Sequence, residues 1–232
     1  MILSAHQVNF LPYLGFFEKL IKSNIFILLD DVQFVHTGPL AWMNKNRIRT
    51  KDGAQYITVP VLVKGRFRQN LNEVEINRDY DWRRKILGAI KQNYIKSPFF
   101  NQIYPHLQSI FNNNYTKLID LNITLLNFLL GYLEFEKIGV KIFYSSQLKI
   151  SGKGTQRLID FCKYFGATKY LSGIHGRDYL QQELFACQQV EIIWHEFKAK
   201  EYPQQFSPFV PNLSVIDPLF NIGKKVLDLL LP

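Results

Sequence analysis

Residues 2–31, ILSAHQVNFLPYLGFFEKLIKSNIFILLDD, decide the fold of this chain. Residues 2–5 predict a short buried strand, and apolar side chains recur at helical spacing between Pro12 and Ile21. An unbroken apolar run at 25–29 ends in two aspartates, which is typical of a strand buried on both faces. Strand, helix and strand in this short stretch predict a βαβ unit, and therefore a right-handed crossover and a parallel sheet.

The rest of the chain repeats this alternation after a middle part of different character. Short strands are expected first, at 54–63 and 72–76. Further strands are expected at residues 141–144, 169–171 and 191–195, and further helices at 82–94, 98–112, 115–133, 155–165, 177–185 and 214–231. Five parallel strand candidates predict one α/β domain, 1–232, with a Rossmann-like, mainly parallel sheet and a basic, partly β insertion at about 36–80.

Composition excludes several classes of protein. With 232 residues, 47% hydrophobic and 20% charged, the chain is neither a disordered tail nor a low-complexity linker. Cys162 and Cys187 lack the CxxC spacing of a zinc ribbon or a redox motif. No basic segment precedes the first apolar residues, and polar residues interrupt the most apolar stretch, 118–133. We therefore expect a cytoplasmic protein without a signal peptide or a membrane span.

The net charge of +9 is concentrated in one region. Residues 36–96 contain 13 Lys and Arg against 5 Asp and Glu, which leaves the remaining chain nearly neutral. This asymmetry favours an anionic partner at one surface, although a solvated basic face that aids solubility is an equal alternative. Peripheral contact with anionic lipid is a third interpretation. Nucleic acid is not expected, because the motifs of its common binding folds are absent.

Polar residues follow each of the five strands of the expected sheet. They are His6 and Gln7, Asp30 and Asp31, Ser145 and Ser146, residues 172–176, and His195 with Glu196. Ligands of open α/β sheets bind at the carboxyl ends of the strands, so these residues predict a binding cleft. A small anionic substrate, such as a nucleotide or a nucleotide sugar, fits the nearby basic region.

His6 is the central candidate in this cleft, as an acid, a base or a phosphate ligand, and a satisfied buried imidazole is its structural alternative. One of the two aspartates could hold a metal-bound polyphosphate, cap a helix or pair with an arginine.

The GKGT stretch at 152–155 resembles a phosphate loop but lacks the upstream glycine of a Walker A motif. We expect His6, Gln7 and Asp30 to be catalytic, no resident metal ion, and substrate or phosphate contacts from Asn9, Lys19, Asp31, Asn44, Arg47, Lys153, Arg157, Ser172, Gly173 and His175.

Several separated motifs coincide with one family. They are residues 6–19, 30–34, Trp42 with 44–48, 58–61, 145–146, 170–173 with 178–180, and 213–217 with Gly223. In this order they resemble the WbqC-like proteins, and the likeness runs from Ile2 to Gly223. The resemblance implies a place in bacterial polysaccharide and O-antigen synthesis, and a glycine or aminoacyl transfer to an amino sugar. Val8 and His175 depart from the family pattern, which makes His175 doubtful as a shared catalytic group.

The expected layout is also similar to the nucleotidyltransferase-like Rossmann proteins, which include amide-forming synthetases, although their HxGH motif is absent. This analogy implies ATP, with Mg²⁺, as a cosubstrate that activates a carboxylate before an amine attacks it. His6, Lys19, Arg47 and Lys153 would then neutralise phosphate charge. A nucleotide- or nucleotide-sugar-binding protein without turnover is the alternative, because it needs the same anion contacts.

Overall fold

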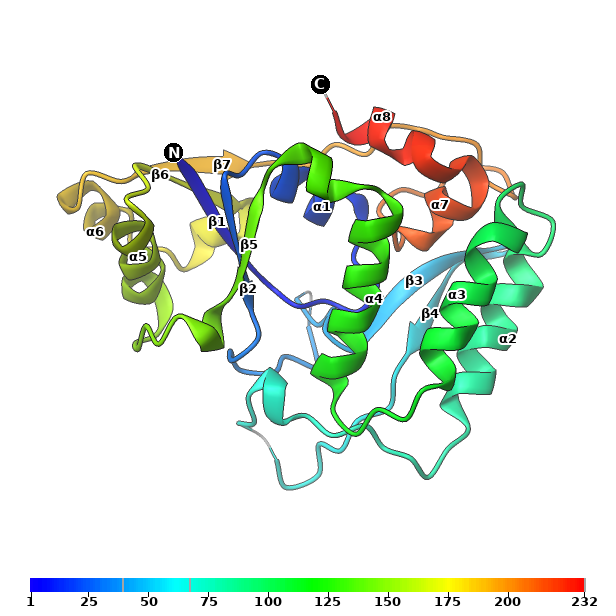
Figure 1. Cartoon of the computed structure of the whole chain (residues 1–232). Coiled ribbons are helices and arrows are strands. Elements are labelled where there is room, and N and C mark those ends of the chain that lie inside the picture. The colour runs from blue at the N-terminus through cyan, green and yellow to red at the C-terminus, as the bar shows by residue number, and fades with distance from the viewer. Residues whose placement is uncertain (39, 67, 232) are drawn as a thin grey trace.

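The computed structural model describes residues 1–38, 40–66 and 68–231, so Pro39 and Phe67 of the expected insertion, and Pro232, lie outside the described residues. The main sheet has the strand order β5-β2-β1-β6-β7, and all four neighbouring pairs are parallel (Figure 1). Its strands are β1 (Ile2–Gln7), β2 (Ile25–Leu29), β5 (Lys141–Tyr144), β6 (Lys169–Gly173) and β7 (Glu191–His195). The predicted parallel pairing of the first two strands is confirmed.

Helices cover both faces of this sheet. In β2, Phe26 and Leu28 pack into the core that contains α1 (Leu14–Ile21). Ile25 and Ile27 face the other way, into the core formed with α5 (Gly154–Phe165) and α6 (Gln182–Cys187). From β1 the chain adds β2 and then β5 on one side of the sheet. It then crosses back and adds β6 on the other side of β1. The sheet therefore has a topological switch point between β1 and β6, where open α/β sheets bind ligands.

The insertion is a separate β-hairpin followed by three helices. Strands β3 (Lys45–Thr50) and β4 (Gly53–Thr58) pair in antiparallel register. The helices are α2 (Trp82–Tyr94), α3 (Phe100–Asn112) and α4 (Leu118–Tyr132). The expected strand at 54–63 is too long, since β4 ends two residues before Pro60, which cannot donate to a ladder. The expected strand at 72–76 is wrong: Leu71–Glu73 is a 3-10 turn, because Asn70 and Glu73 form a capping box.

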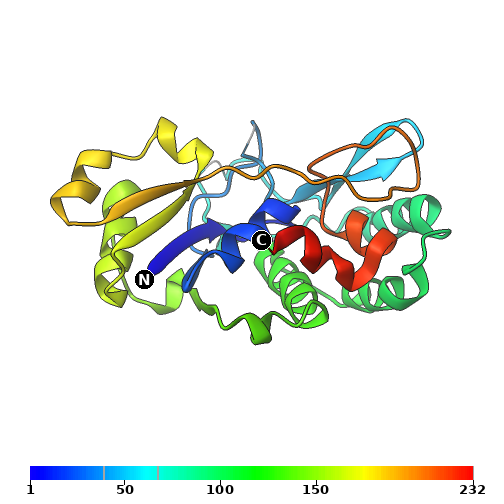
Figure 2. The same cartoon turned by 90° about the horizontal axis from the view of Figure 1, so that it is seen from above.

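The C-terminal part returns to the insertion. Residues 196–213, here called the strap, run without a helix or strand from β7 across to the β3–β4 hairpin (Figure 2). The expected helix at 214–231 is divided into α7 (Ile216–Ile222) and α8 (Val226–Leu230) at Gly223, whose φ of 58° suits glycine. The expected helix at 177–185 is likewise a 3-10 turn followed by α6. None of the described helices is long and apolar enough to cross a membrane.

Candidate functional site

A cleft with two compartments opens at the switch point. The strand-end compartment, of about 330 Å³, lies over the ends of β1, β6 and β7, and its lining includes Gly15, Lys19, Ser172, Gly173 and His195. The hairpin compartment, of about 310 Å³, lies toward β3 and is lined in part by Asn9, Trp42, Asn46 and Arg47. The two adjoin each other, since they share the wall residues His6, Gln7, Tyr13, Leu40, His175 and Asn212.

His6 lies at the junction of the two compartments. Its Nδ1 is 2.9 Å from the carbonyl oxygen of Gln7, which can only accept, so Nδ1 carries the proton and Nε2 the lone pair. Burial, and then the nearby Lys19, lower the pKa of His6 to about 3. The ring is therefore neutral at pH 7, and this favours a hydrogen-bond acceptor over a phosphate-binding cation.

Lys19 reaches the strand-end compartment from α1 and is only 4% exposed. Its Nζ donates to the carbonyl oxygen of Ala5, at 2.8 Å. No described carboxylate forms an ion pair with it. Burial alone lowers the pKa of Lys19 to about 7, so neutral amine and ammonium are both populated near neutral pH.

His195 lines the same compartment and is paired with Glu18, a carboxylate that lines neither compartment. His195 Nε2, at the end of β7, donates to Glu18 Oε2 at 2.5 Å, and this leaves Nδ1 as the basic nitrogen. Burial lowers the pKa of His195 more than Glu18 raises it. Burial opposes the charge of Glu18, but hydrogen bonds from Lys22 and His195 keep its pKa below the usual value. Such a pair can accept a proton from a substrate.

Two unpartnered polar atoms mark the hairpin compartment. Asn9 is 4% exposed, and its Oδ1, an acceptor, has no hydrogen-bond partner. Arg47 donates through Nη2 to the carbonyl oxygen of Asn212, at 3.2 Å, whereas its buried Nε has no partner. The Arg47 guanidinium lies over the ring of Trp42, 5.7 Å from its centroid. Asn9 and Arg47 therefore both line this small cavity, and each carries a polar atom that is shielded from solvent and has no partner.

The structure brings most of the expected site residues together. His6, Gln7, Lys19, Ser172, Gly173 and His175 line the strand-end compartment, and Asn9 and Arg47 line the hairpin compartment. The sequence placed His195 among the strand-end residues of the cleft without assigning it a role, and it gave no role to Glu18 or Tyr13. The position of His195 after the last strand was the available signal, but its partner is 177 residues away in the chain.

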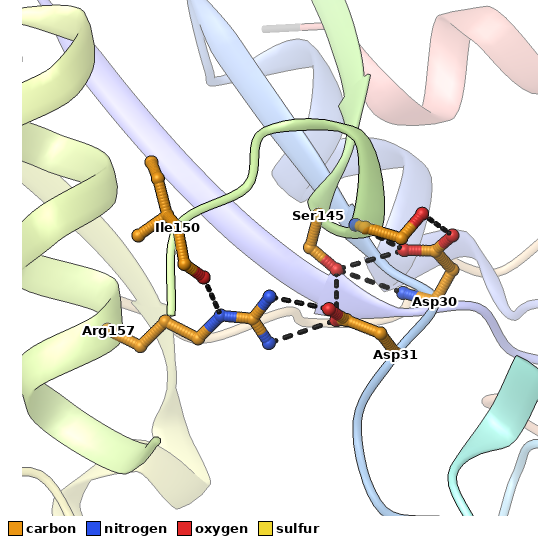
Figure 3. Close-up of polar contacts among 6 residues, drawn as sticks. Asp30, Asp31, Ser145, Ile150 and Arg157 are labelled. Atoms are coloured by element: carbon orange, nitrogen blue, oxygen red, sulfur yellow. Dashed lines mark hydrogen bonds and ion pairs between the residues drawn. The ribbon is translucent and has the colours of Figure 1, made fainter. Parts of the chain in front are cut away.

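The two expected aspartates lie outside the cleft, in a clamp between β2, β5 and α5 (Figure 3). Asp30 accepts hydrogen bonds from Ser145 and Ser146, the latter through Oγ at 2.6 Å. Asp31 accepts two from Arg157, at 2.9 and 2.6 Å, and one from Ser145. Since Ser145 Oγ contacts both carboxylates, they converge on one hydroxyl. The clamp uses Asp30, Asp31 and Arg157 to hold the sheet together rather than to face a ligand.

Two further expected residues do not line either compartment. Lys153 is exposed and directly precedes α5. Asn44 is buried in the hairpin region and donates to the carbonyl oxygen of Val59, at 3.0 Å. Among the described residues there is also no group of three His, Cys, Asp or Glu side chains that could hold a metal ion.

Comparisons with known proteins place this cleft in a family context. The sequence model of a family described as the WbqC-like protein family matches residues 7–228. The chain is 34% identical over 226 residues to the uncharacterized protein Rv1507c of Mycobacterium tuberculosis, a match that covers 97% of this chain and 95% of that protein. No solved structure matches the chain significantly.

Proposed function

The chain belongs to the WbqC-like protein family, and from this premise we propose that it transfers a glycyl or other aminoacyl group to the amine of an amino sugar. The sugar would be an intermediate of bacterial surface polysaccharide synthesis, such as O-antigen, carried on a nucleotide. The resemblance of the motifs to this family supports the reaction class, and the cleft supports the presence of two substrates.

The free donor and acceptor of the hairpin compartment carry this proposal. When the side chains turn these two shielded atoms toward the cavity, Arg47 Nε can donate to a carboxylate and Asn9 Oδ1 can accept from an ammonium or amide N–H. An amino acid presents both groups, one carbon apart. Buried polar atoms without a partner are costly, so a ligand that satisfies both gains free energy on binding.

ATP would activate the amino acid in this reaction. A carboxylate oxygen attacks the α-phosphorus, which forms an acyl adenylate and releases pyrophosphate, with Mg²⁺ accompanying the ATP phosphates. The sugar amine then attacks the acyl carbon, an amide bond forms, and AMP leaves with the carboxylate's oxygen. His195 Nδ1 would take the proton that the amine loses, while Glu18 stabilises the resulting imidazolium. The cleft at the switch point of the parallel sheet supports nucleotide binding next to this pair, as in the Rossmann-like, nucleotidyltransferase-like layout that we propose for it.

The direct test is a mass-spectrometric assay with glycine, ATP, Mg²⁺ and dTDP- or UDP-linked amino sugars. We expect an amide product heavier than the sugar by one glycyl residue, and AMP in equal amount. Arg47→Met should lose this product, whereas Arg84→Met, on the exposed face of α2, should retain it. Other amino acids and CoA thioesters, offered in parallel, would identify a different acyl donor.

His195→Gln separates catalysis from binding. We expect turnover to fall by about 100-fold or more, the range of a lost acid–base group, while nucleotide affinity changes little. Nucleotide-sugar binding without any product in the wild type would instead identify a non-catalytic binding protein that uses the same cleft.

A further inference from the structure

In the ligand-free protein the amine of Lys19 is buried without a carboxylate partner among the described residues. It donates instead to the backbone carbonyl oxygen of Ala5. An ammonium removed from water without a counter-charge costs several kcal/mol even after local relaxation. A side chain kept only for packing would be more stable as an apolar residue of the same length.

The neighbouring groups do not supply that counter-charge. His6, on β1, is neutral at pH 7, and His195, on β7, contributes no negative charge. Glu18, the adjacent carboxylate on α1, is held by His195 and by Lys22, at 2.5 and 3.0 Å. Glu196 also lines the compartment, but it is exposed and forms no ion pair with Lys19. Lys19 is therefore a buried amine without a carboxylate partner of its own among the described residues.

The cavity is suited to receive an anion. Gly15 and Lys19 are four residues apart on α1, so they lie on one face of the helix, and both line the strand-end compartment. Gly15 stands in the first turn of α1, where the helix dipole favours negative charge. The compartment's volume, about 330 Å³, is at the lower end of the range of small-molecule sites.

We propose that Lys19 anchors the phosphoryl group of a nucleotide substrate, which enters the strand-end compartment as the missing counter-ion. That the ligand is a nucleotide rests on the proposed function. The phosphoryl group itself is inferred from the surroundings of Lys19 alone. The hairpin compartment would then hold the amino acid, and the reacting atoms would meet near His6, on the shared wall.

Inorganic pyrophosphate is the probe for this site, because it carries the charge without a base or a sugar. We expect it to raise the Tm of the wild type, as a ligand of the native state does. Lys19→Met, which keeps the length of the side chain and removes its charge, should abolish the rise. The Tm of ligand-free Lys19→Met should equal or exceed that of the wild type, because an uncompensated buried amine has been removed.

Lys163→Met is the matched control, since Lys163 is exposed on α5 and lines neither compartment. It should retain the full response to pyrophosphate. The proposal is overturned if pyrophosphate does not stabilise the wild type, or if the response survives in Lys19→Met. A lower Tm of the ligand-free Lys19→Met protein would assign Lys19 a structural role instead.

Chemical protection keeps the test decisive if Lys19→Met does not fold. Wild-type protein is treated with acetic anhydride at pH 8, and acetylation is mapped by mass spectrometry. Pyrophosphate should protect Lys19 and leave Lys163 unprotected, and equal acetylation of Lys19 with and without it would refute the site. The same acetylation experiment, run separately with ATP and with UDP, identifies which nucleotide supplies the phosphoryl group. Pyrophosphate binding without any aminoacyl transfer would support this site and reject the proposed function.

Discussion

The depressed pKa of Lys19, about 7, makes a prediction about stability and pH. Between this value and the ordinary value of about 10.4, the unfolded chain binds more protons at Lys19 than the folded protein does. The free energy of unfolding of the wild type, relative to Lys19→Met, should therefore rise with pH above 7, by up to about 1.4 kcal/mol per unit. Urea unfolding of both proteins at pH 6.5, 7.5 and 8.5 measures this difference, and a flat difference would contradict the assignment.

Gly15 controls the position of Tyr13. A Cβ at Gly15 would lie 2.4 Å from the Tyr13 ring, so Gly15→Ala must displace the ring, which lines both compartments. Alanine favours the helix by about 1 kcal/mol, which offsets the cost of moving the ring. We expect a nearly unchanged Tm but a weaker response to pyrophosphate. Gly88→Ala, in α2 with open space around it, should stabilise the protein by about 1 kcal/mol and leave that response unchanged.

Arg49 shows what residue patterns alone do not indicate. Because side chains alternate along a strand, Lys45, Arg47 and Arg49 lie on one side of β3. Arg47 and Arg49 do contact the same strap, but Arg49 is 1% exposed and donates to four carbonyl oxygens. A charged residue rarely lies so deep, and its partners at 206 and 208 are more than 150 residues away.

At the scale of elements, the clamp between β2, β5 and α5 is a structural ion pair. Hydrogen bonds from Arg157 and Ser145 outweigh burial and hold the pKa of Asp31 below its usual value. A carboxylate of this kind stabilises the fold above its unfolded pKa, and the contribution is lost as pH falls through its folded pKa. Arg157→Met should cost about 1–3 kcal/mol at pH 7 and less at pH 3, measured by urea unfolding.

The Tm response to pyrophosphate is a second measurement on Arg157→Met. Arg157 lines neither compartment, so the Tm rise caused by pyrophosphate should persist in Arg157→Met. Loss of that rise without loss of stability would place Arg157 in the binding site, as the sequence had suggested.

Elements with strong local signals were predictable, and those set by distant contacts were not. The apolar run at 25–29 and the alternation of strands and helices around it predicted the parallel sheet correctly. The carboxyl ends of parallel strands meet at one edge of a sheet, and His6 and Ser172, which follow two such strands, line the same compartment. The hairpin strand β3 carries five polar or charged residues among its six and lacks a strand pattern. The pairing of Glu18 with His195 depends on tertiary packing and leaves no local signal.

At the scale of the whole molecule, Arg49 ties the strap to the hairpin, and the strap forms part of the cleft through Phe197 and Asn212. Arg49→Met leaves four carbonyl oxygens without their charged donor, so we expect a loss of more than about 3 kcal/mol in the free energy of unfolding. Arg47→Met removes one hydrogen bond, to the carbonyl oxygen of Asn212 at 3.2 Å, and should lower the free energy of unfolding by less than about 1 kcal/mol. Chemical unfolding distinguishes them, and similar losses would show that the strap is held elsewhere.

The central place of β1 in the sheet has a consequence for synthesis on the ribosome. One neighbour, β2, is made within seconds, but the other, β6, begins at Lys169, roughly 140 residues after β2 ends. At about 5–20 residues per second, the open edge of β1 waits on the order of ten seconds for its partner. During that time an apolar strand edge is exposed to other nascent chains. Translation speed and chaperone supply should therefore affect the yield of folded protein.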